Sequence, residues 1–243
     1  PYSLFSVSSF LVVGTAAQNF DFGGLGGEPK FCPPYRCPKD HEAVPVWPLK
    51  LSSAGCVGLG GMQAFMPNAG GEDDPHTPCC DQRHACIQTC GVVKTFCDEE
   101  FLKCSKDVCD KMSDAEAKKK CDSSVSVNEL MLKMDQCQQY NAEQGAHCQC
   151  IKKSDVASKR ERVLRNFYKK FNPDSVDKVP GLMKKVDSAR KMAGLLTKLY
   201  KKYPSVIKKV KDPQQEMMEK IMRDAKDKKS DEGEEVDEDD EES

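Results

Sequence analysis

CCDQRHACIQTCG, residues 79–91, is the stretch that decides the fold, because its cysteines recur at the spacing of a helix. At about 100° per residue, four of its side chains fall on one stripe of a helix: Cys79, Arg83, Cys86 and Cys90. A matching stripe in the next predicted helix consists of Cys97, Phe101, Cys104 and Val108. We expect an antiparallel helix pair, from Cys79 to about Gly91 and from Asp98 to about Met112, with disulfides between the facing stripes. Spacing alone leaves the disulfide connectivity open.

The other cysteines extend this pattern in both directions, since all 14 lie between Cys32 and Cys150 and none lies in the last 93 residues. Such density is typical of a small domain that is cross-linked in an oxidising compartment. A zinc-binding cytosolic domain is disfavoured, because Cys79 and Cys80 are adjacent and no paired C-x-x-C clusters occur. The sequence therefore predicts an all-α, disulfide-rich domain over residues 18–152.

The first residues have the features of a signal peptide. Leu4 to Val13 is largely apolar, and the small residues Gly14 to Ala17 follow as at a signal-peptidase site. The apolar run is too short to span a bilayer, and the chain begins with Pro1 instead of Met. We expect residues 1–17 to be an N-terminally incomplete signal peptide, and the protein to be secreted or to reside in the lumen of the secretory pathway.

The character of the chain changes after Cys150. Residues 152–229 carry 24 Lys and Arg against 10 Asp and Glu, with apolar residues at helical spacing and prolines that divide the stretch. Ten of the fourteen residues of 230–243 are acidic, which is typical of a disordered tail. We expect a basic helical extension over residues 153–229 and an acidic disordered tail over residues 230–243.

Two parts of the cysteine-rich domain are less regular. From Gln18 to Pro78 the chain is rich in glycine and proline, which predicts loops held by cross-links. A third helical stretch is expected from about Val125 to Tyr140. The histidines outside the motif have no partners at metal or catalytic spacing, so we expect them to be solvated: His41, His76 and His147.

The motif at residues 79–91 resembles the active-site helix of secreted phospholipases A2, whose pattern is C-C-x-x-H-D-x-C. The group XII branch is the most similar, since the spacing of Cys97, Cys104 and Cys109 and the closing Cys148-x-Cys150 fit it. The resemblance covers roughly half of the chain. It implies a phospholipase A2-like helix pair linked by disulfides, a glycine-rich calcium loop and a surface that faces lipid.

The resemblance also implies a chemistry. In the family a histidine acts as general base on the water that attacks the sn-2 ester, an aspartate on the second helix orients it, and Ca²⁺ polarises the ester carbonyl. Asp98 is in the place of the orienting aspartate. The glycine-rich loop is present as CVGLGG, residues 56–61. The candidate calcium ligands are the carbonyl oxygens of Cys56, Gly58 and Gly60, with His84 in the position of the family's calcium aspartate.

Two positions depart from the family pattern. Arg83 stands where the family has its catalytic histidine, and His84 stands where it has aspartate. Arginine stays protonated, so Arg83 cannot accept a proton from water. His84 is turned by about 100° from the cysteine stripe and is a poor replacement for a hard oxygen ligand. We expect Arg83 to pair with Asp98 across the two helices.

Two functions follow. In the first, the protein is a calcium-dependent phospholipase A2 in which His84 is displaced toward Asp98 or the substrate. In the second, it is a catalytically silent relative that keeps the fold in order to bind lipid or a protein partner. The chemistry of Arg83 and His84 favours the second function.

The basic extension is a further candidate for lipid contact. Lys-rich amphipathic segments can lie on anionic phospholipid surfaces, with these aromatic residues at the interface: Phe167, Tyr168, Phe171 and Tyr200. Ordinary solvated helices are the alternative. Nucleic-acid binding is disfavoured in a secreted chain. The basic and acidic C-terminal segments could also bind a protein partner.

Overall fold

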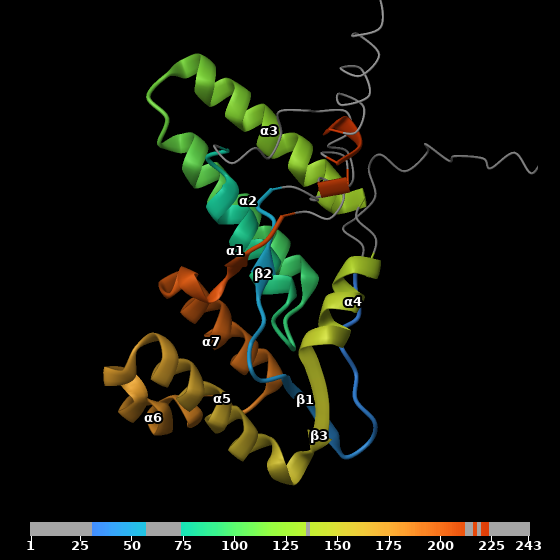
Figure 1. The fold of residues 1–243 in the computed structure, drawn as a ribbon, viewed down its shortest axis with the longest axis vertical. Helices are drawn as coiled ribbons and strands as arrows, with labels where there is room; N and C mark the ends of the chain where they lie inside the picture. Colours follow the sequence, from blue (N-terminus) through green and yellow to red (C-terminus); the bar gives the residue numbers. More distant parts are fainter. Residues whose placement is uncertain (1–30, 57–73, 135–136, 212–215, 218–219, 224–243) are drawn as a thin grey trace, which may run out of the picture.

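The structure is a computed structural model that describes residues 31–56, 74–134, 137–211, 216–217 and 220–223. The predicted signal peptide, the loop at residues 57–61 and the acidic tail lie outside these residues. The main elements are β1 (His41–Pro45), β2 (Ser52–Ser53), α1 (Thr77–Ile87), α2 (Lys94–Asp110), α3 (Ala115–Met134), α4 (Cys137–His147), β3 (Cys148–Lys152), α5 (Val156–Phe171), α6 (Val179–Met183), α7 (Ala189–Lys202) and β4 (Lys208–Lys209). In Figure 1, α2 and α3 form one end of the molecule and α5 and α6 the other.

All 14 cysteines are paired in seven disulfides, and no cysteine is free. The pairs are Cys32–Cys137, Cys37–Cys150, Cys56–Cys80, Cys79–Cys104, Cys86–Cys97, Cys90–Cys148 and Cys109–Cys121. Because the sulfurs bond to one another, they leave no thiolates for a structural zinc ion. The predicted disulfide-rich helical class is therefore confirmed.

Two of these disulfides join α1 to α2. Cys79 near the start of α1 pairs with Cys104 late in α2, whereas Cys86 near the end of α1 pairs with Cys97 early in α2. The two helices therefore run in opposite directions. The stripe was expected to continue to Cys90, but α1 ends at Ile87 and Cys90 pairs with Cys148 at the start of β3.

A buried glutamine accounts for the sharp turn after α1. The Gln144 side chain donates to the carbonyl oxygens of Ile87 (2.8 Å) and Thr89 (2.9 Å) and accepts from the Gly91 amide (3.1 Å). Gly91 has φ +85°, a conformation that glycine adopts readily. These bonds satisfy backbone groups that the end of a helix leaves without partners. They also attach the turn to α4.

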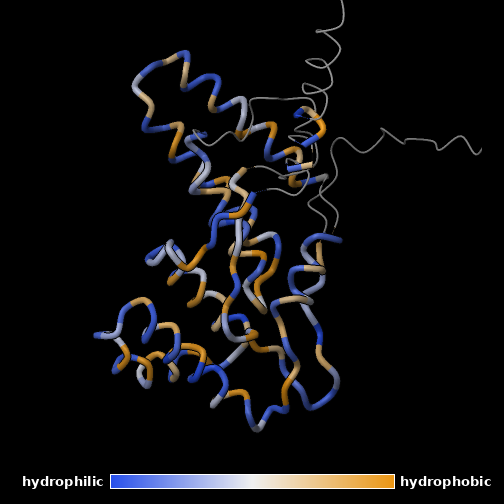
Figure 2. The backbone as a smooth tube through the Cα atoms, in the orientation of Figure 1, coloured by the Kyte–Doolittle hydropathy of each residue, from blue (hydrophilic) through white to orange (hydrophobic). Residues whose placement is uncertain are grey.

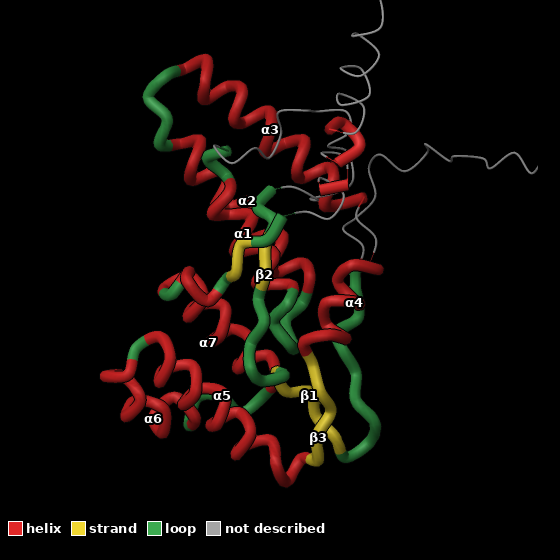
Figure 3. The backbone as a smooth tube through the Cα atoms, viewed as in Figure 1, coloured by secondary structure: helices red, strands yellow, loops and turns green. Residues whose placement is uncertain are grey.

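The prediction that the domain is all-α was wrong in one respect, because the fold contains two short sheets (Figure 3). β1 pairs antiparallel with β3, with Ala43 opposite Cys150, and β2 pairs in parallel with β4. Val44 is fully buried, so β1 contributes to the core as well as to the sheet. The stretch expected to contain only loops between Gln18 and Pro78 thus supplies two strands.

The predicted third helical stretch was also too short. Two helices occupy this part of the chain: α3 begins at Ala115, ten residues before Val125, and α4 continues to His147, seven residues beyond Tyr140. A disulfide attaches each helix to another part of the chain. Cys121 in α3 pairs with Cys109 in α2, and Cys137 at the start of α4 pairs with Cys32.

The C-terminal helices form a core together with the cysteine-rich part. Hydrophobic and hydrophilic residues alternate along α5 and α7 (Figure 2). Their apolar faces pack in one cluster that also contains Leu51 and Ala85 of α1. Prolines fit the ends of these helices as expected, since α5 ends before Pro173 and α7 before Pro204.

The proposal that aromatic residues of the extension face a membrane is contradicted. Phe167 is 0% exposed, Tyr200 2% and Tyr168 6%, and Phe171 packs against the same cluster. The Phe167 ring contacts those of Phe171 and Tyr203 at centroid distances of 4.9 and 5.8 Å. These rings are therefore core residues. No helix in the described ranges has the length and apolar character needed to cross a bilayer.

Candidate functional site

The centre of the candidate site is the Asp98 carboxylate, which lies between two cations. The Arg83 Nε atom donates to Asp98 Oδ1 at 2.8 Å, and the Lys94 Nζ atom lies 2.7 Å from Asp98 Oδ2. The side chains of Arg83, Lys94 and Asp98 are 2%, 4% and 14% exposed. The predicted pairing of Arg83 with Asp98 is confirmed, but it forms part of a largely buried triad with Lys94.

The two interhelix disulfides place Arg83 opposite Asp98. Arg83 lies between Cys79 and Cys86 on the α1 stripe, and Asp98 directly follows Cys97 on α2. Because Cys79 bonds to Cys104 and Cys86 bonds to Cys97, the helices are cross-linked on both sides of the ion pair. Two charged hydrogen bonds to one buried carboxylate then offset part of the cost of removing the three charges from water.

Lys94 was missed in the sequence analysis. The second helix was expected to begin at Asp98, which would place Lys94 in the preceding turn. The helix instead begins at Lys94, so Lys94 and Asp98 are four residues apart on one helix face. The Lys94 ammonium also donates to the Leu132 carbonyl oxygen in α3 at 3.4 Å. The spacing of four residues was the available signal.

His84 lies in α1, directly after Arg83, and is buried with 8% exposure. Helix α1 is continuous from Thr77 to Ile87, so the backbone shows no local break that would turn His84 toward Asp98. Among the described residues, Asp98 is bonded to Arg83 and Lys94, and no hydrogen bond or ion pair joins it to His84. The structure thus does not bring the two proposed dyad residues, His84 and Asp98, into contact.

The described part of the predicted calcium site does not fit calcium. Gly58 and Gly60 lie outside the described residues, and Cys56 is tied to α1 by its disulfide with Cys80. The position expected to supply a carboxylate offers the imidazole of His84, which is a poor ligand for a hard cation. The nearest acidic residue on α1, Asp81, forms an ion pair with Lys209 of β4.

Two histidines outside the motif differ from the expectation that they are solvated. The side chain of His147 is only 18% exposed, and its ring nitrogens lie 2.9 and 3.2 Å from the carbonyl oxygens of Glu143 and Lys50. His76 is buried (5% exposed), and its Nε2 atom lies 3.3 Å from Cys121 Sγ. His76, Cys109 and Cys121 form a cluster of metal-ligand types, but the two sulfurs are bonded to each other. A disulfide lacks the negative charge of a thiolate ligand, so the cluster is structural.

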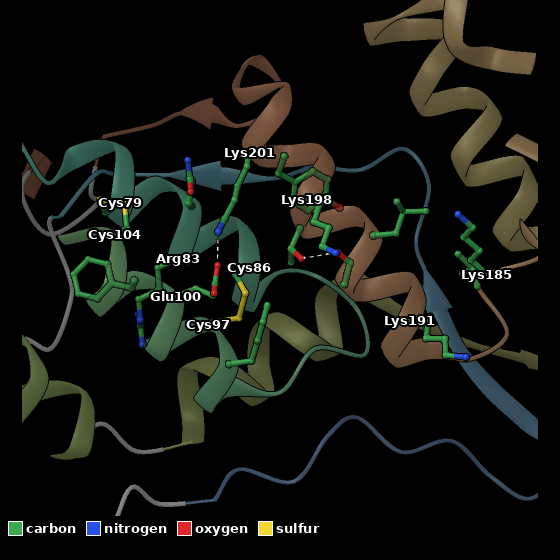
Figure 4. A pocket seen from close by; sticks show the side chains of 18 of the residues that line it. Cys79, Arg83, Cys86, Cys97, Glu100, Cys104, Lys185, Lys191, Lys198 and Lys201 are labelled. Atoms are coloured by element: carbon green, nitrogen blue, oxygen red, sulfur yellow. Dashed lines mark hydrogen bonds and ion pairs between the residues drawn. A yellow bond between two sulfur atoms is a disulfide. The ribbon is translucent and has the colours of Figure 1, made fainter. Parts of the chain in front are cut away.

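A cavity of about 570 Å³ lies between the helix pair and α7 (Figure 4). Arg83 lines it from α1, but the guanidinium is bonded to Asp98. The rest of the α1 and α2 wall includes both interhelix disulfides and Phe101. Sequence reasoning did not find this cavity, because its second wall comes from the extension that was treated as a separate segment.

Comparison with known proteins gives two relatives. Over 86 residues, 35% of this chain, the sequence is 36% identical to group XIIA secretory phospholipase A2 of Mus musculus and 35% identical to that of Homo sapiens. The match covers 42% and 43% of those proteins, so the chain spans less than half the length of the curated relatives it matches. No family model and no solved structure matches. The predicted resemblance to group XII phospholipases A2 is confirmed over this stretch.

Proposed function

Because the chain is a homologue of group XIIA secretory phospholipases A2, we propose that it is a secreted phospholipase A2-like protein that binds phospholipid surfaces without hydrolysing them. One observation carries the proposal: both oxygens of the Asp98 carboxylate are bonded to cationic side chains. The seven disulfides and the names of the relatives support a secreted location.

A hydrolytic dyad requires a group that accepts a proton from water and a carboxylate that orients it. Arg83 occupies the position of the base, and a guanidinium group offers hydrogen-bond donors but no acceptor for a proton. Asp98, the orienting carboxylate, is bonded to Arg83 and Lys94 instead of an imidazole. The site therefore has the charge pattern of a structural ion-pair network.

Calcium binding is proposed to be weak or absent for a related reason. The described site provides an imidazole where a carboxylate is needed, and it holds two buried cations on Asp98. A divalent cation is repelled by such charges in a medium of low dielectric. Isothermal titration with CaCl₂ should give no heat of binding, and the Arg83→His, His84→Asp double variant should bind more tightly.

The decisive experiment measures sn-2 fatty acid released from mixed phospholipid vesicles in the presence of Ca²⁺. The natural protein should release no more than buffer does. The Arg83→His, His84→Asp double variant restores the family pattern but leaves Lys94 on Asp98, so its activity should be low. Adding Lys94→Met should raise the activity further, because the carboxylate is then free to orient the new imidazole.

The proposal would be overturned if the protein were an active phospholipase A2 that uses the displaced histidine, His84. In that case the natural protein hydrolyses vesicles in a calcium-dependent way, and His84→Ala abolishes the activity. His41→Ala is the matched control, since His41 lies at the start of β1, away from the helix pair. Phospholipid binding is measured separately by sedimentation with anionic and zwitterionic vesicles. No binding to either kind would refute the surface role.

A further inference from the structure

The cavity between the helix pair and α7 has an apolar interior. Its walls include Phe101 of α2, Leu195 of α7, and Leu182 and Val186 from the segment before α7. Val186 is buried, whereas Leu182 and Leu195 are only partly buried, so apolar surface remains accessible from the cavity. Phe96, which is 36% exposed, also lines it. Such a lining is typical of sites for small apolar ligands.

The mouth of the cavity is positively charged. Four lysines line it: Lys185, Lys191, Lys198 and Lys201. Figure 4 shows Lys201 joined to Glu100, and Lys185 and Lys191 farther along the cavity. Lys201 is paired with Glu100 and Lys191 with Asp187. Within the described ranges, Lys185 and Lys198 have no acidic partner, so two exposed positive charges remain uncompensated beside an apolar cavity.

From this combination we propose that the cavity binds one long-chain fatty acid, with the acyl chain between α2 and α7 and the carboxylate beside Lys198 or Lys185. The volume of about 570 Å³ lies within the range of about 300–1,000 Å³ found for pockets that hold one small molecule. One acyl chain matches a site of this size better than the two chains of a phospholipid. The lysines select an anionic head group over a neutral one.

This site goes beyond the proposed binding to phospholipid surfaces, because α7 supplies one of its walls and the ligand is a single dissolved molecule. Arg83 is not available as the partner of the carboxylate, since its Nε atom is bonded to Asp98. The exposed lysines at the mouth can receive an anionic head group while it stays partly hydrated. The acyl chain gains most of the binding free energy from its removal from water.

The test uses the full-length oxidised protein and the fluorescent fatty acid cis-parinaric acid, below its aggregation threshold and without vesicles. Fluorescence should rise on binding, and palmitate should displace the probe at lower concentrations than hexadecanol does. Equal displacement by the acid and the alcohol would refute the role of the lysines. Absence of binding would refute the site without bearing on vesicle sedimentation.

Two lysine variants test whether the fatty acid binds at the mouth of this cavity. Lys198→Glu should weaken binding about fivefold, as expected for reversal of one exposed charge. Lys202→Glu is the matched control, because Lys202 is on the same helix, changes the net charge equally and does not line the cavity. Equal effects of the two variants would contradict binding at this mouth.

Filling the cavity gives a test that does not depend on charge. Gly194 lines it, and an added Cβ there meets no heavy atom within 4 Å, so a side chain at this position begins in open space. Gly194→Leu should reduce probe binding at least severalfold while the helical circular dichroism stays unchanged. A folded Gly194→Leu protein that binds the probe normally would overturn the proposal.

Discussion

Lys94 and Asp98 lie one turn apart on α2, with the Lys94 ammonium 2.7 Å from Asp98 Oδ2. On an exposed helix such a pair contributes only a few tenths of a kcal/mol. Here both side chains are largely buried, and Asp98 also bonds to Arg83 of α1. One carboxylate therefore neutralises part of two buried positive charges.

Removing that carboxylate should be more harmful than removing one of its partners. Asp98→Ala removes the carboxylate that bonds to both buried cations, Arg83 and Lys94, so we expect a loss of about 3–5 kcal/mol in the free energy of unfolding. Arg83→Met keeps the Lys94 contact and should cost less, about 1–3 kcal/mol. Denaturant unfolding of the oxidised proteins measures both values. The reverse order would show that Asp98 does not balance both cations.

The Gln144 side chain should be essential to the turn after α1. Gln144→Leu keeps an apolar stem of similar size but leaves two buried carbonyls and one amide without their partner. We expect a loss of about 2–4 kcal/mol in stability. Gln139→Leu, on the exposed face of the same helix α4, is the control and should change stability by less than about 0.5 kcal/mol. Equal thermal shifts for the two variants would contradict this role.

Glu42 should hold the C-terminal helices to the sheet. Its Oε1 atom pairs with the buried Arg160 of α5 and accepts from the backbone amide of Ala189 at the N-terminus of α7 (3.2 Å). Glu42→Ala leaves the Arg160 charge buried and unpaired, and we expect a loss of about 3–5 kcal/mol. Hydrogen exchange in α5 and α7 should accelerate.

The control for this prediction is Glu161→Ala. Glu161 forms an ion pair with Arg165 at 2.7 Å on α5, and both side chains are exposed to about the same degree. Surface pairs of this kind are worth about 0–1 kcal/mol. Exchange rates in α7 that are the same for both variants would mean that Glu42 is dispensable there.

The raised pKa of the Tyr140 hydroxyl leads us to expect that the protein loses stability at high pH. Burial raises the pKa of Tyr140 from 10.0 to about 12, and its hydroxyl donates to the Val92 carbonyl oxygen at 2.6 Å. Because the unfolded chain loses the proton first, this stabilisation is complete below about pH 10 and disappears between pH 10 and about pH 12. Tyr140→Phe should lower stability by about 1 kcal/mol at neutral pH and flatten the alkaline decline. Denaturant midpoints across this range test both effects, and an unchanged slope would contradict the assignment.

The arrangement of α1 and α2 could be predicted from the sequence because its signal is local. Cysteines seven residues apart, Cys79 and Cys86 on α1 and Cys97 and Cys104 on α2, mark the facing sides of the two helices. The Arg83–Asp98 pairing was expected from the family resemblance, which places Asp98 at the orienting position. The contact of Lys94 with Asp98 was not predicted, because the start of α2 was placed four residues too late. Helix ends depend on capping and packing, which a cysteine pattern does not record.

The sheet and the aromatic core were missed for a different reason. β1 pairs with β3, which lies more than 100 residues later in the chain. A local sequence pattern cannot identify a strand partner at that distance. The apolar faces of α5 and α7 have the same periodicity whether they meet a membrane or a protein core. The 0% exposure of Phe167, and its place in one cluster with Ala85 and Leu51, show that it is internal.

The cluster that joins Leu51 and Ala85 to α5 and α7 has a practical consequence for where this chain can be cut. A fragment ending at residue 152 would contain every cysteine and could form all seven cross-links. It would nevertheless expose the apolar surface that the later helices cover. Full oxidation of such a fragment would thus be no proof of correct folding, and the cysteine boundary is a poor guide to the smallest stable unit.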